Sequence, residues 1–123
     1  IVTPHKREFL RLFGIKGDEK SILTQSKKYK CNIVLKGKVD YISDGVHVYS
    51  NFSGNSGMTT GGTGDILAGI ICSFLAKNNC LESALAGTFL CGYAGDMLAG
   101  KPFCATDIIT ELPNAHNSLK TFI

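Results

Sequence analysis

The stretch "GNSGMTTGGTGD" at residues 54–65 decides how the rest of the sequence is interpreted. It holds five glycines, three threonines and a single acid, Asp65, and a helix-like apolar pattern begins directly after it. Glycine permits a positive φ angle and lets a ligand approach the backbone closely. A glycine-rich loop that leads into a helix points several N–H groups in one direction, and the helix N-terminus adds about half a positive charge. The stretch therefore predicts an anion site, and phosphate is the common anion for such a site.

Two familiar phosphate-binding patterns do not fit this stretch. No lysine follows the last glycine, which excludes the GxxxxGK[ST] pattern, and Leu67 stands where the dinucleotide-binding pattern GxGxxG has its third glycine. Asp65 is the informative residue, because an acid repels a bound phosphate. Either it caps the following helix, or it is a general base that takes a proton from a substrate hydroxyl, which then attacks a phosphoryl group held by the loop. The local sequence leaves both interpretations open.

Composition limits the class of protein. Of the 123 residues, 44% are hydrophobic and 19% are charged, which is typical of a globular domain. No apolar run approaches the ~20 residues that span a bilayer, so no membrane association is expected. Ten of the thirteen lysines and arginines lie in residues 1–40, but no nucleic-acid-binding module accompanies them, and we interpret "SKKYK" as a solvated helix face. Five cysteines without a CxxC spacing predict reduced thiols in the cytoplasm and no metal-ligating residues.

The order of predicted elements indicates an α/β fold. We expect a strand end at 1–3, helices at 4–13 and 19–30, a strand at 31–35, a hairpin around Asp44 and Gly45, and helices at 66–77, 81–100 and from 106, the last bent near Pro113. Three strands are too few to be sandwiched between five helices, so an upstream half with more strands is expected. Asp96 is polar inside an apolar helix, and we expect it to hydrogen-bond within that helix.

The glycine-rich stretch resembles the Gly-Asn-Pro-Gly-Met-Ala-Thr-Gly-Gly-x-Gly-Asp signature of the ADP/ATP-dependent NAD(P)H-hydrate dehydratases, in the ribokinase-like superfamily. Ser56 and Thr59 depart from it, and the matching residues are Gly54, Asn55, Gly57, Met58, Thr60, Gly61, Gly62, Gly64 and Asp65. "IVTPHKREF" resembles the family's Thr-Pro-His-x-x-Glu segment through Thr3, Pro4, His5 and Glu8. "IVLKGKVD" resembles a strand that carries Lys-Gly, with Asp40 in place of the usual threonine, and Cys91 stands where the family often has His.

The resemblance implies a fold and an activity. The fold would be a ribokinase-like α/β/α sandwich, with residues 1–123 as the C-terminal part of a single catalytic domain. The reaction would restore NADH or NADPH from the hydrated cofactor while consuming ADP or ATP with Mg²⁺. The partners would be these small molecules, with no nucleic acid and no membrane, and a homo-oligomer is left open. A small-molecule kinase of the same superfamily, such as a hydroxyethylthiazole-type kinase, is the alternative, and a non-catalytic nucleotide-binding module is a third hypothesis.

The resemblance also assigns the site. Asp65 would be the catalytic base and would contact the hydrated cofactor, and His5 would lie on the substrate side. The residues expected to contact the nucleotide are Lys36, Gly37, Lys38, Val39, Asp40, Asn55, Gly57, Met58, Thr60, Gly61, Gly62, Thr63 and Gly64. Among these, Asp40 departs from the family pattern.

Overall fold

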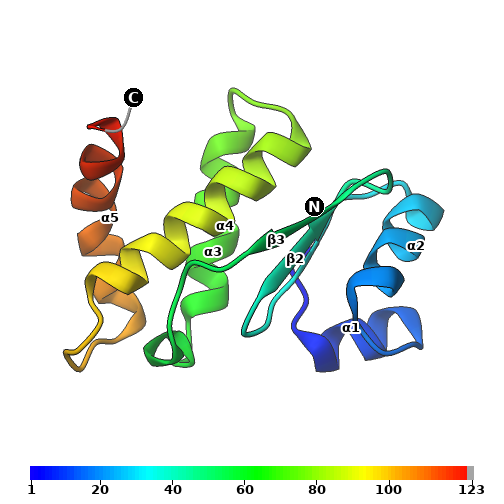
Figure 1. Cartoon of the computed structure of the whole chain (residues 1–123), viewed down its shortest axis with the longest axis horizontal. Coiled ribbons are helices and arrows are strands. Elements are labelled where there is room, and N and C mark those ends of the chain that lie inside the picture. Colours follow the sequence, from blue (N-terminus) through cyan, green and yellow to red (C-terminus); the bar gives the residue numbers. More distant parts are fainter. Residues whose placement is uncertain (122–123) are drawn as a thin grey trace.

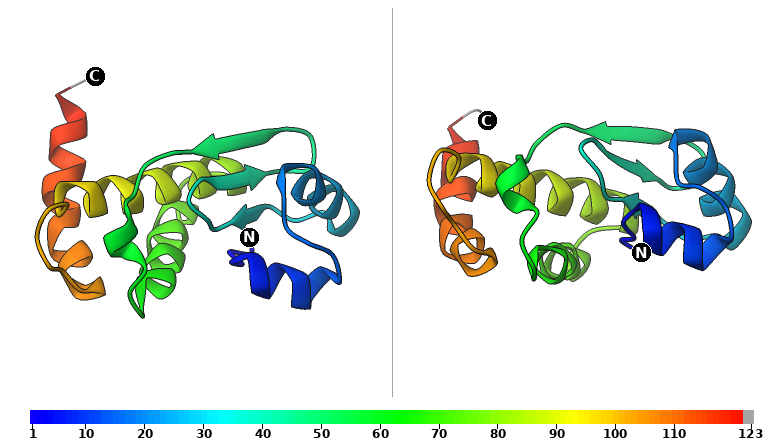
Figure 2. Two further views of the ribbon diagram at one scale, coloured as in Figure 1. Left: turned by 60° about the horizontal axis from the view of Figure 1, so that its bottom comes forward. Right: turned by 90° about the horizontal axis from the view of Figure 1, so that it is seen from below.

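The computed structural model describes residues 1–121 and arranges them in layers, with a small sheet between two groups of helices (Figures 1 and 2). Helices α1 and α2 lie on one side of the sheet, α3 and α4 lie on the other, and α5 packs outermost against α4. The elements are α1 (Lys6–Phe13), α2 (Glu19–Tyr29), β1 (Ile33–Leu35), β2 (Asp40–Ser43), β3 (Val48–Asn51), the 3₁₀ helix η1 (Ser56–Met58), α3 (Thr63–Leu75), α4 (Cys80–Met97) and α5 (Ala105–Lys120). The predicted α/β class is confirmed.

The sheet is antiparallel in the order β1-β2-β3, and the first residues of the chain extend it. The β2–β3 turn contains Gly45, whose φ of 90° explains why the predicted hairpin turns there. Beyond β1, residues 2–5 run parallel to it: the Val34 N–H donates to the Val2 carbonyl at 2.9 Å, and the Lys36 N–H donates to the Pro4 carbonyl at 2.9 Å. The strand end predicted at the start of the chain is therefore confirmed, and it brings residues 3–5 beside Lys36.

Local capping sets where the helices begin. His5 is the N-cap of α1 and forms a capping box with Glu8, and Asp18 is the N-cap of α2. Helix α3 begins at Thr63, three residues before the predicted start, because Gly62 is its N-cap. Helix α5 begins at Ala105 and continues through Pro113. Tyr29, at the end of α2, is 52% exposed.

Two cores lie on the two faces of the sheet. A larger one joins the sheet to α3, α4 and α5, and a smaller one joins it to α1 and α2. Helix α4 is buried around most of its circumference, as its apolar composition predicted. Small residues let neighbours approach it closely: a Cβ atom on Gly87 would lie 3.0 Å from the Ile71 Cα, and one on Gly92 would lie 2.6 Å from the carbonyl carbon of Ser53.

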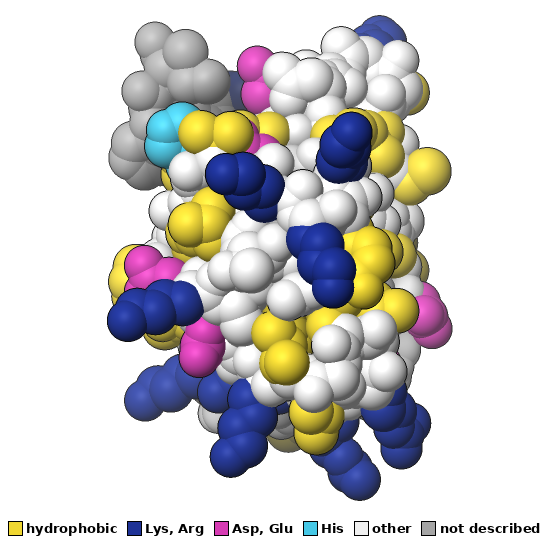
Figure 3. Space-filling model, turned by 90° about the vertical axis from the view of Figure 1, so that its right-hand side faces the viewer, with side chains coloured by type: hydrophobic (Ala, Val, Ile, Leu, Met, Phe, Trp, Pro, Cys, Tyr) yellow, Lys and Arg dark blue, Asp and Glu magenta, His cyan; other side chains and the backbone are white. Residues whose placement is uncertain are grey.

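The outer face of α1 and α2 is solvated. Residues 27–30, which include three lysines, are exposed, and Figure 3 shows Lys and Arg side chains spread over this side of the molecule among patches of apolar surface. The interpretation of "SKKYK" as a solvated helix face is thus confirmed for residues 27–30, whereas Ser26 is buried and its hydroxyl donates to the Ser43 carbonyl at 3.1 Å. Within residues 1–121, no helix combines the length and the apolar character that crossing a membrane requires.

Candidate active site

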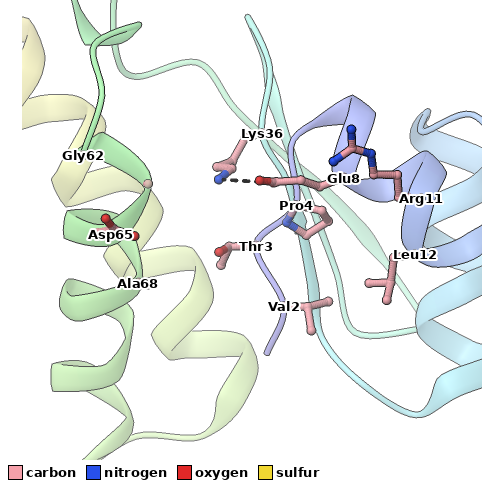
Figure 4. A pocket seen from close by; sticks show the side chains of 11 residues that line it. Val2, Thr3, Pro4, Glu8, Arg11, Leu12, Lys36, Gly62, Asp65 and Ala68 are labelled. Atoms are coloured by element: carbon pink, nitrogen blue, oxygen red, sulfur yellow. Dashed lines mark ion pairs between the residues drawn. The ribbon is translucent and has the colours of Figure 1, made fainter.

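The N-terminus of α3 forms one wall of an open cleft of about 720 Å³ (Figure 4). Its N-cap, Gly62, has φ 95° and ψ −16°, a conformation that glycine adopts readily. The first N–H groups of an α-helix have no acceptor within the helix, so they are available to an anion. The opposite wall comes from residues 2–4 and α1. The lining residues are Val2, Thr3, Pro4, Glu8, Arg11, Leu12, Lys36, Gly62, Gly64, Asp65 and Ala68.

Asp65 lies in the first turn of α3, two residues after its first residue, and not at the N-cap. The N-cap interpretation of Asp65 is therefore wrong. Its side chain is exposed to the cleft, and none of residues 1–121 donates a hydrogen bond to its carboxylate. A carboxylate in the first turn of a helix interacts favourably with the helix dipole. Asp65 thus presents a free anionic acceptor beside the N–H groups of the helix.

Three segments that are far apart in the sequence meet at this cleft. Lys36, at the end of β1, extends toward α3, and a Cβ atom on Gly64 would lie 3.1 Å from its Nζ. The same Nζ is 3.8 Å from Oε2 of Glu8 in α1. Figure 4 shows Thr3, Lys36 and Glu8 across the cleft from Asp65. Two cationic groups, Lys36 and Arg11, and two acids therefore face one space.

His5 holds Glu8 in place and is not among the residues that line the cleft. Its Nδ1 accepts hydrogen bonds from the N–H groups of Arg7 and Glu8 at 3.1 and 3.2 Å, and its Nε2 lies 3.1 Å from Oε1 of Glu8. The backbone N–H of His5 donates to Oε2 of Glu8 at 2.7 Å. This hydrogen bond, helped by the charge of Lys36, lowers the pKa of Glu8. The Glu8 carboxylate is therefore kept ionised at the edge of the cleft.

The loop between β1 and β2 is shaped by Asp40. The Gly37 N–H donates to Oδ1 of Asp40 at 3.0 Å, and Nδ2 of Asn51 donates to Oδ2 at 3.1 Å. Burial raises the pKa of Asp40. Gly37, Lys38 and Val39 follow Lys36 in this loop, and Asp40 is the first residue of β2, but none of these four residues lines the cleft. Both carboxylate oxygens of Asp40 already have partners within the chain, so the structure gives Asp40 a role in shaping the loop.

The start of the glycine-rich loop is fastened to α4. The side chain of Asn55 caps η1 by accepting from the Gly57 N–H at 2.9 Å, and its Nδ2 donates to the Gly95 carbonyl at 2.8 Å. The Gly54 N–H donates to Oδ2 of Asp96 at 2.8 Å. The expectation that Asp96 bonds within its own helix is wrong, because the nearest donors come from a loop some forty residues earlier.

The other predicted loop residues fall into two groups. Met58 is partly buried against the larger core, and a Cβ atom on Gly95 would lie 2.8 Å from its Cγ. Thr60 and Gly61 lie at the tip of the loop, and the hydroxyl of Thr63, the first residue of α3, donates to the Thr60 carbonyl at 2.9 Å. Neither group lines the cleft, in contrast to Gly62 and Gly64.

Sequence reasoning assigned no role in the site to three polar residues that line the cleft: Thr3 and Glu8, which only matched the family's segment, and Arg11. A signal for Glu8 was present, because an acid three residues after an N-cap is the pattern of a capping box. Arg11 follows one helical turn after Glu8 on the same face of α1, so a helical reading of residues 6–13 places both side chains together.

Comparison with known proteins identifies the family of this chain. A family model described as NAD(P)H-hydrate dehydratase matches residues 1–114. The chain is 46% identical, over 99% of its length, to the bifunctional NAD(P)H-hydrate repair enzyme Nnr of Archaeoglobus fulgidus, of which it covers 26%. It is 40% identical, over 93% of its length, to the ADP-dependent (S)-NAD(P)H-hydrate dehydratase of Cenarchaeum symbiosum, of which it covers 43%. The chain thus spans less than half the length of these relatives.

Solved structures establish the fold. The ADP/ATP-dependent NAD(P)H-hydrate dehydratase from Bacillus subtilis, co-crystallized with ATP/Mg²⁺, superposes with a TM-score of 0.89 at 24% identity, over 95% of this chain and 47% of that one. A ribokinase-like superfamily protein from Enterococcus faecalis superposes with a TM-score of 0.82 at 31% identity, over 94% of this chain and 44% of that one. The expected ribokinase-like fold is confirmed. Because the family model covers nearly the whole chain, the chain belongs to the NAD(P)H-hydrate dehydratase family.

Proposed function

We propose that the protein carrying this chain is a carbon–oxygen lyase that dehydrates hydrated NADH or NADPH at the expense of ADP or ATP. We also propose that residues 1–123 form the C-terminal part of a single catalytic domain. One observation carries the proposal: the free carboxylate of Asp65 lies beside the N-terminus of α3 and across the cleft from Lys36. A base, an anion site and a cation in one cleft are the groups that phosphoryl transfer to a hydroxyl requires.

The chemistry follows from these groups. Asp65 takes the proton of the hydroxyl on the hydrated ring, and the hydroxyl oxygen attacks the terminal phosphoryl group of the nucleotide. The bridging P–O bond of that group breaks, and the nucleotide leaves one phosphate shorter, as ADP from ATP or as AMP from ADP. The N–H groups of the α3 N-terminus and the ammonium of Lys36 neutralise the charge that develops on the phosphoryl oxygens. Phosphate is a much better leaving group than hydroxide. The nitrogen of the ring then expels phosphate, and a proton lost from the adjacent carbon restores the double bond.

The described residues fit a magnesium ion that travels with the nucleotide. No three His, Cys, Asp or Glu side chains cluster in residues 1–121, so a metal ion there needs ligands from outside these residues. Mg²⁺ usually keeps several waters and is held by one or two carboxylates together with substrate phosphates. The ionised carboxylate of Glu8 is the group that we propose to face the ion. Bound there, Mg²⁺ would screen the charge of the phosphates.

The remaining assignments follow from the family. We propose that residues 36–40 and the loop at 55–64 contact the nucleotide and that His5 acts on the substrate side by orienting Glu8. We propose a cytoplasmic location, which the five free cysteines support. Self-association into a homo-oligomer stays a prediction.

The fate of the phosphorylated hydroxyl tests the proposal. The full-length protein is given hydrated NADH, Mg²⁺ and ADP or ATP, and inorganic phosphate and the absorbance of reduced nicotinamide are followed together. We expect phosphate release and recovery of NADH absorbance in step. A small-molecule kinase would instead yield a stable phosphorylated alcohol from a panel of alcohols and no recovery of absorbance. A protein that binds nucleotide and yields neither product would be a binding module.

A further inference from the structure

Asp96 occupies an electrostatically unfavourable place. It is the last residue but one of α4, and a carboxylate near the C-terminal carbonyl groups of a helix is repelled by the helix dipole. Its neighbours in the helix are small or apolar, and its side chain is half-buried. A partly buried charge requires hydrogen-bond partners. The partners of Asp96 therefore show what an acid does at this position.

Both oxygens of Asp96 accept hydrogen bonds from the start of the glycine-rich loop. Oδ2 accepts from the Gly54 N–H at 2.8 Å, and Oδ1 accepts from Nδ2 of Asn55 at 3.2 Å. Gly54 has a φ of 105°, a conformation that glycine adopts readily, and its hydrogen bond to Asp96 holds the backbone there. The amide of Asn55 is thereby oriented with its oxygen toward the Gly57 N–H, 2.9 Å away. One carboxylate thus fixes the backbone direction at the entry to the loop.

The loop is held at its two ends and is free at its tip. At its far end, a Cβ atom on Gly62 would lie 3.2 Å from the Cβ of Ala105 in α5, whereas one on Gly61 would meet no atom within 4 Å. Anion stabilisation requires N–H groups that are already aimed at the developing charge. A loop with a free tip keeps that aim only if its ends are fixed.

We propose that Asp96 is a positioning residue for the reaction: by fixing Gly54 and Asn55 it sets the direction in which the glycine-rich loop presents its N–H groups to phosphate. This inference rests on the proposed function. Asp96 does not line the cleft, so it acts through the loop and touches no substrate. The hydrogen bond from Gly54 to Asp96 joins residues that are 42 positions apart in the sequence. It ties the loop to α4, so α4 supports the loop.

The test is Asp96→Asn in the full-length protein. Asparagine has nearly the same shape, but it replaces one of the two acceptor oxygens by an NH₂ donor. Either the Gly54 N–H or Nδ2 of Asn55 then loses its acceptor. We expect kcat with hydrated NADH and ADP or ATP to fall on the order of 10²-fold, as a small displacement of catalytic groups does. The dissociation constant of ADP should change less than kcat, because the charge to be stabilised is larger in the transition state. The matched control is Glu82→Gln, the same acid-to-amide change at an exposed position in the first turn of α4, which should leave kcat unchanged.

Two further measurements separate positioning from folding. Amide hydrogen exchange should become faster at Gly54 and Gly57 in the variant, while the melting temperature stays close to that of the wild type. The exchanged pair Asn55→Asp with Asp96→Asn restores one amide–carboxylate contact and should recover part of the lost kcat.

The proposal is overturned if Asp96→Asn keeps kcat within about twofold of the wild type, if loop exchange is unchanged, or if the loss of kcat equals the loss of folded protein measured by circular dichroism. Failure of the wild type to dehydrate hydrated NADH would instead contradict the proposed function. In that case, amide hydrogen exchange in the loop and the affinity for ADP still decide whether Asp96 positions the loop.

Discussion

Replacing either of two adjacent glycines by alanine should give very different results. Gly62 has a φ of 95°, which strains any residue with a Cβ atom, and that atom would also lie 3.2 Å from the Cβ of Ala105. Gly61 has no positive φ, and its added Cβ would meet nothing within 4 Å. Residues held in sparsely populated backbone conformations cost about 1–3 kcal/mol each. We therefore expect Gly62→Ala to lower the free energy of unfolding by about 1–3 kcal/mol, and Gly61→Ala to stay within about 0.5 kcal/mol of the wild type.

The assay is urea unfolding of the wild type and both variants of the full-length protein, with ADP binding followed by calorimetry. If the N-cap of α3 shifts to relieve the strain, the N–H groups turn away from phosphate, and the affinity for ADP should fall together with the stability. Equal effects of the two variants on stability would refute the reasoning, because it rests on two differences between the sites: the backbone conformation and the room for an added Cβ atom.

Three other predictions concern packing and ionisation. Gly92→Ala should lower the free energy of unfolding by about 1–3 kcal/mol or more, because its Cβ would lie 2.6 Å from the backbone carbonyl of Ser53; urea unfolding with an unchanged midpoint would contradict this close approach. Burial raises the pKa of Asp40 above its ordinary value of 3.8, so the native state binds its proton more tightly than the unfolded state. The free energy of unfolding of the wild type relative to Asp40→Asn should therefore fall as the pH rises from below 3.8 through the raised pKa. If unfolding measured over this pH range shows that this free energy increases, the prediction is contradicted. Burial raises the pKa of Cys91 to about 11, so at pH 8 iodoacetamide should label the exposed Cys72 and leave Cys91 unlabelled in the native protein, as mass spectrometry would show.

Local patterns in the sequence predicted the features that depend on near neighbours. The glycine-rich loop, the helix after it and the hairpin at Gly45 are all present, because glycine content and apolar spacing act within a few residues. The same reasoning placed Asp65 next to an anion site. It could not choose between a cap and a free base, since that choice depends on Gly62 adopting the N-cap conformation.

Features that depend on distant contacts were not predictable from spacing alone. Arg11 and Glu8 face the cleft only because residues 2–5 pair with β1 and bring α1 beside Lys36. The partners of Asp96 lie in another segment of the chain, so a charge within an apolar helix signalled that a partner exists without naming it. The resemblance to a family supplied the functional roles, and the tertiary structure supplied the contacts.

The most direct test of the central claim is the turnover of Asp65→Asn in the full-length protein. Asparagine keeps the shape of the side chain but cannot take a proton, and loss of a general base typically costs about 10²- to 10⁴-fold. The matched control is Asp107→Asn, which changes an acid at the equivalent position of α5, outside the cleft. We predict that kcat with hydrated NADH falls by about 10²- to 10⁴-fold in Asp65→Asn alone, while its melting temperature and ADP affinity stay close to those of the wild type. Near-normal turnover of Asp65→Asn would contradict the account, because the cleft would then work without its base.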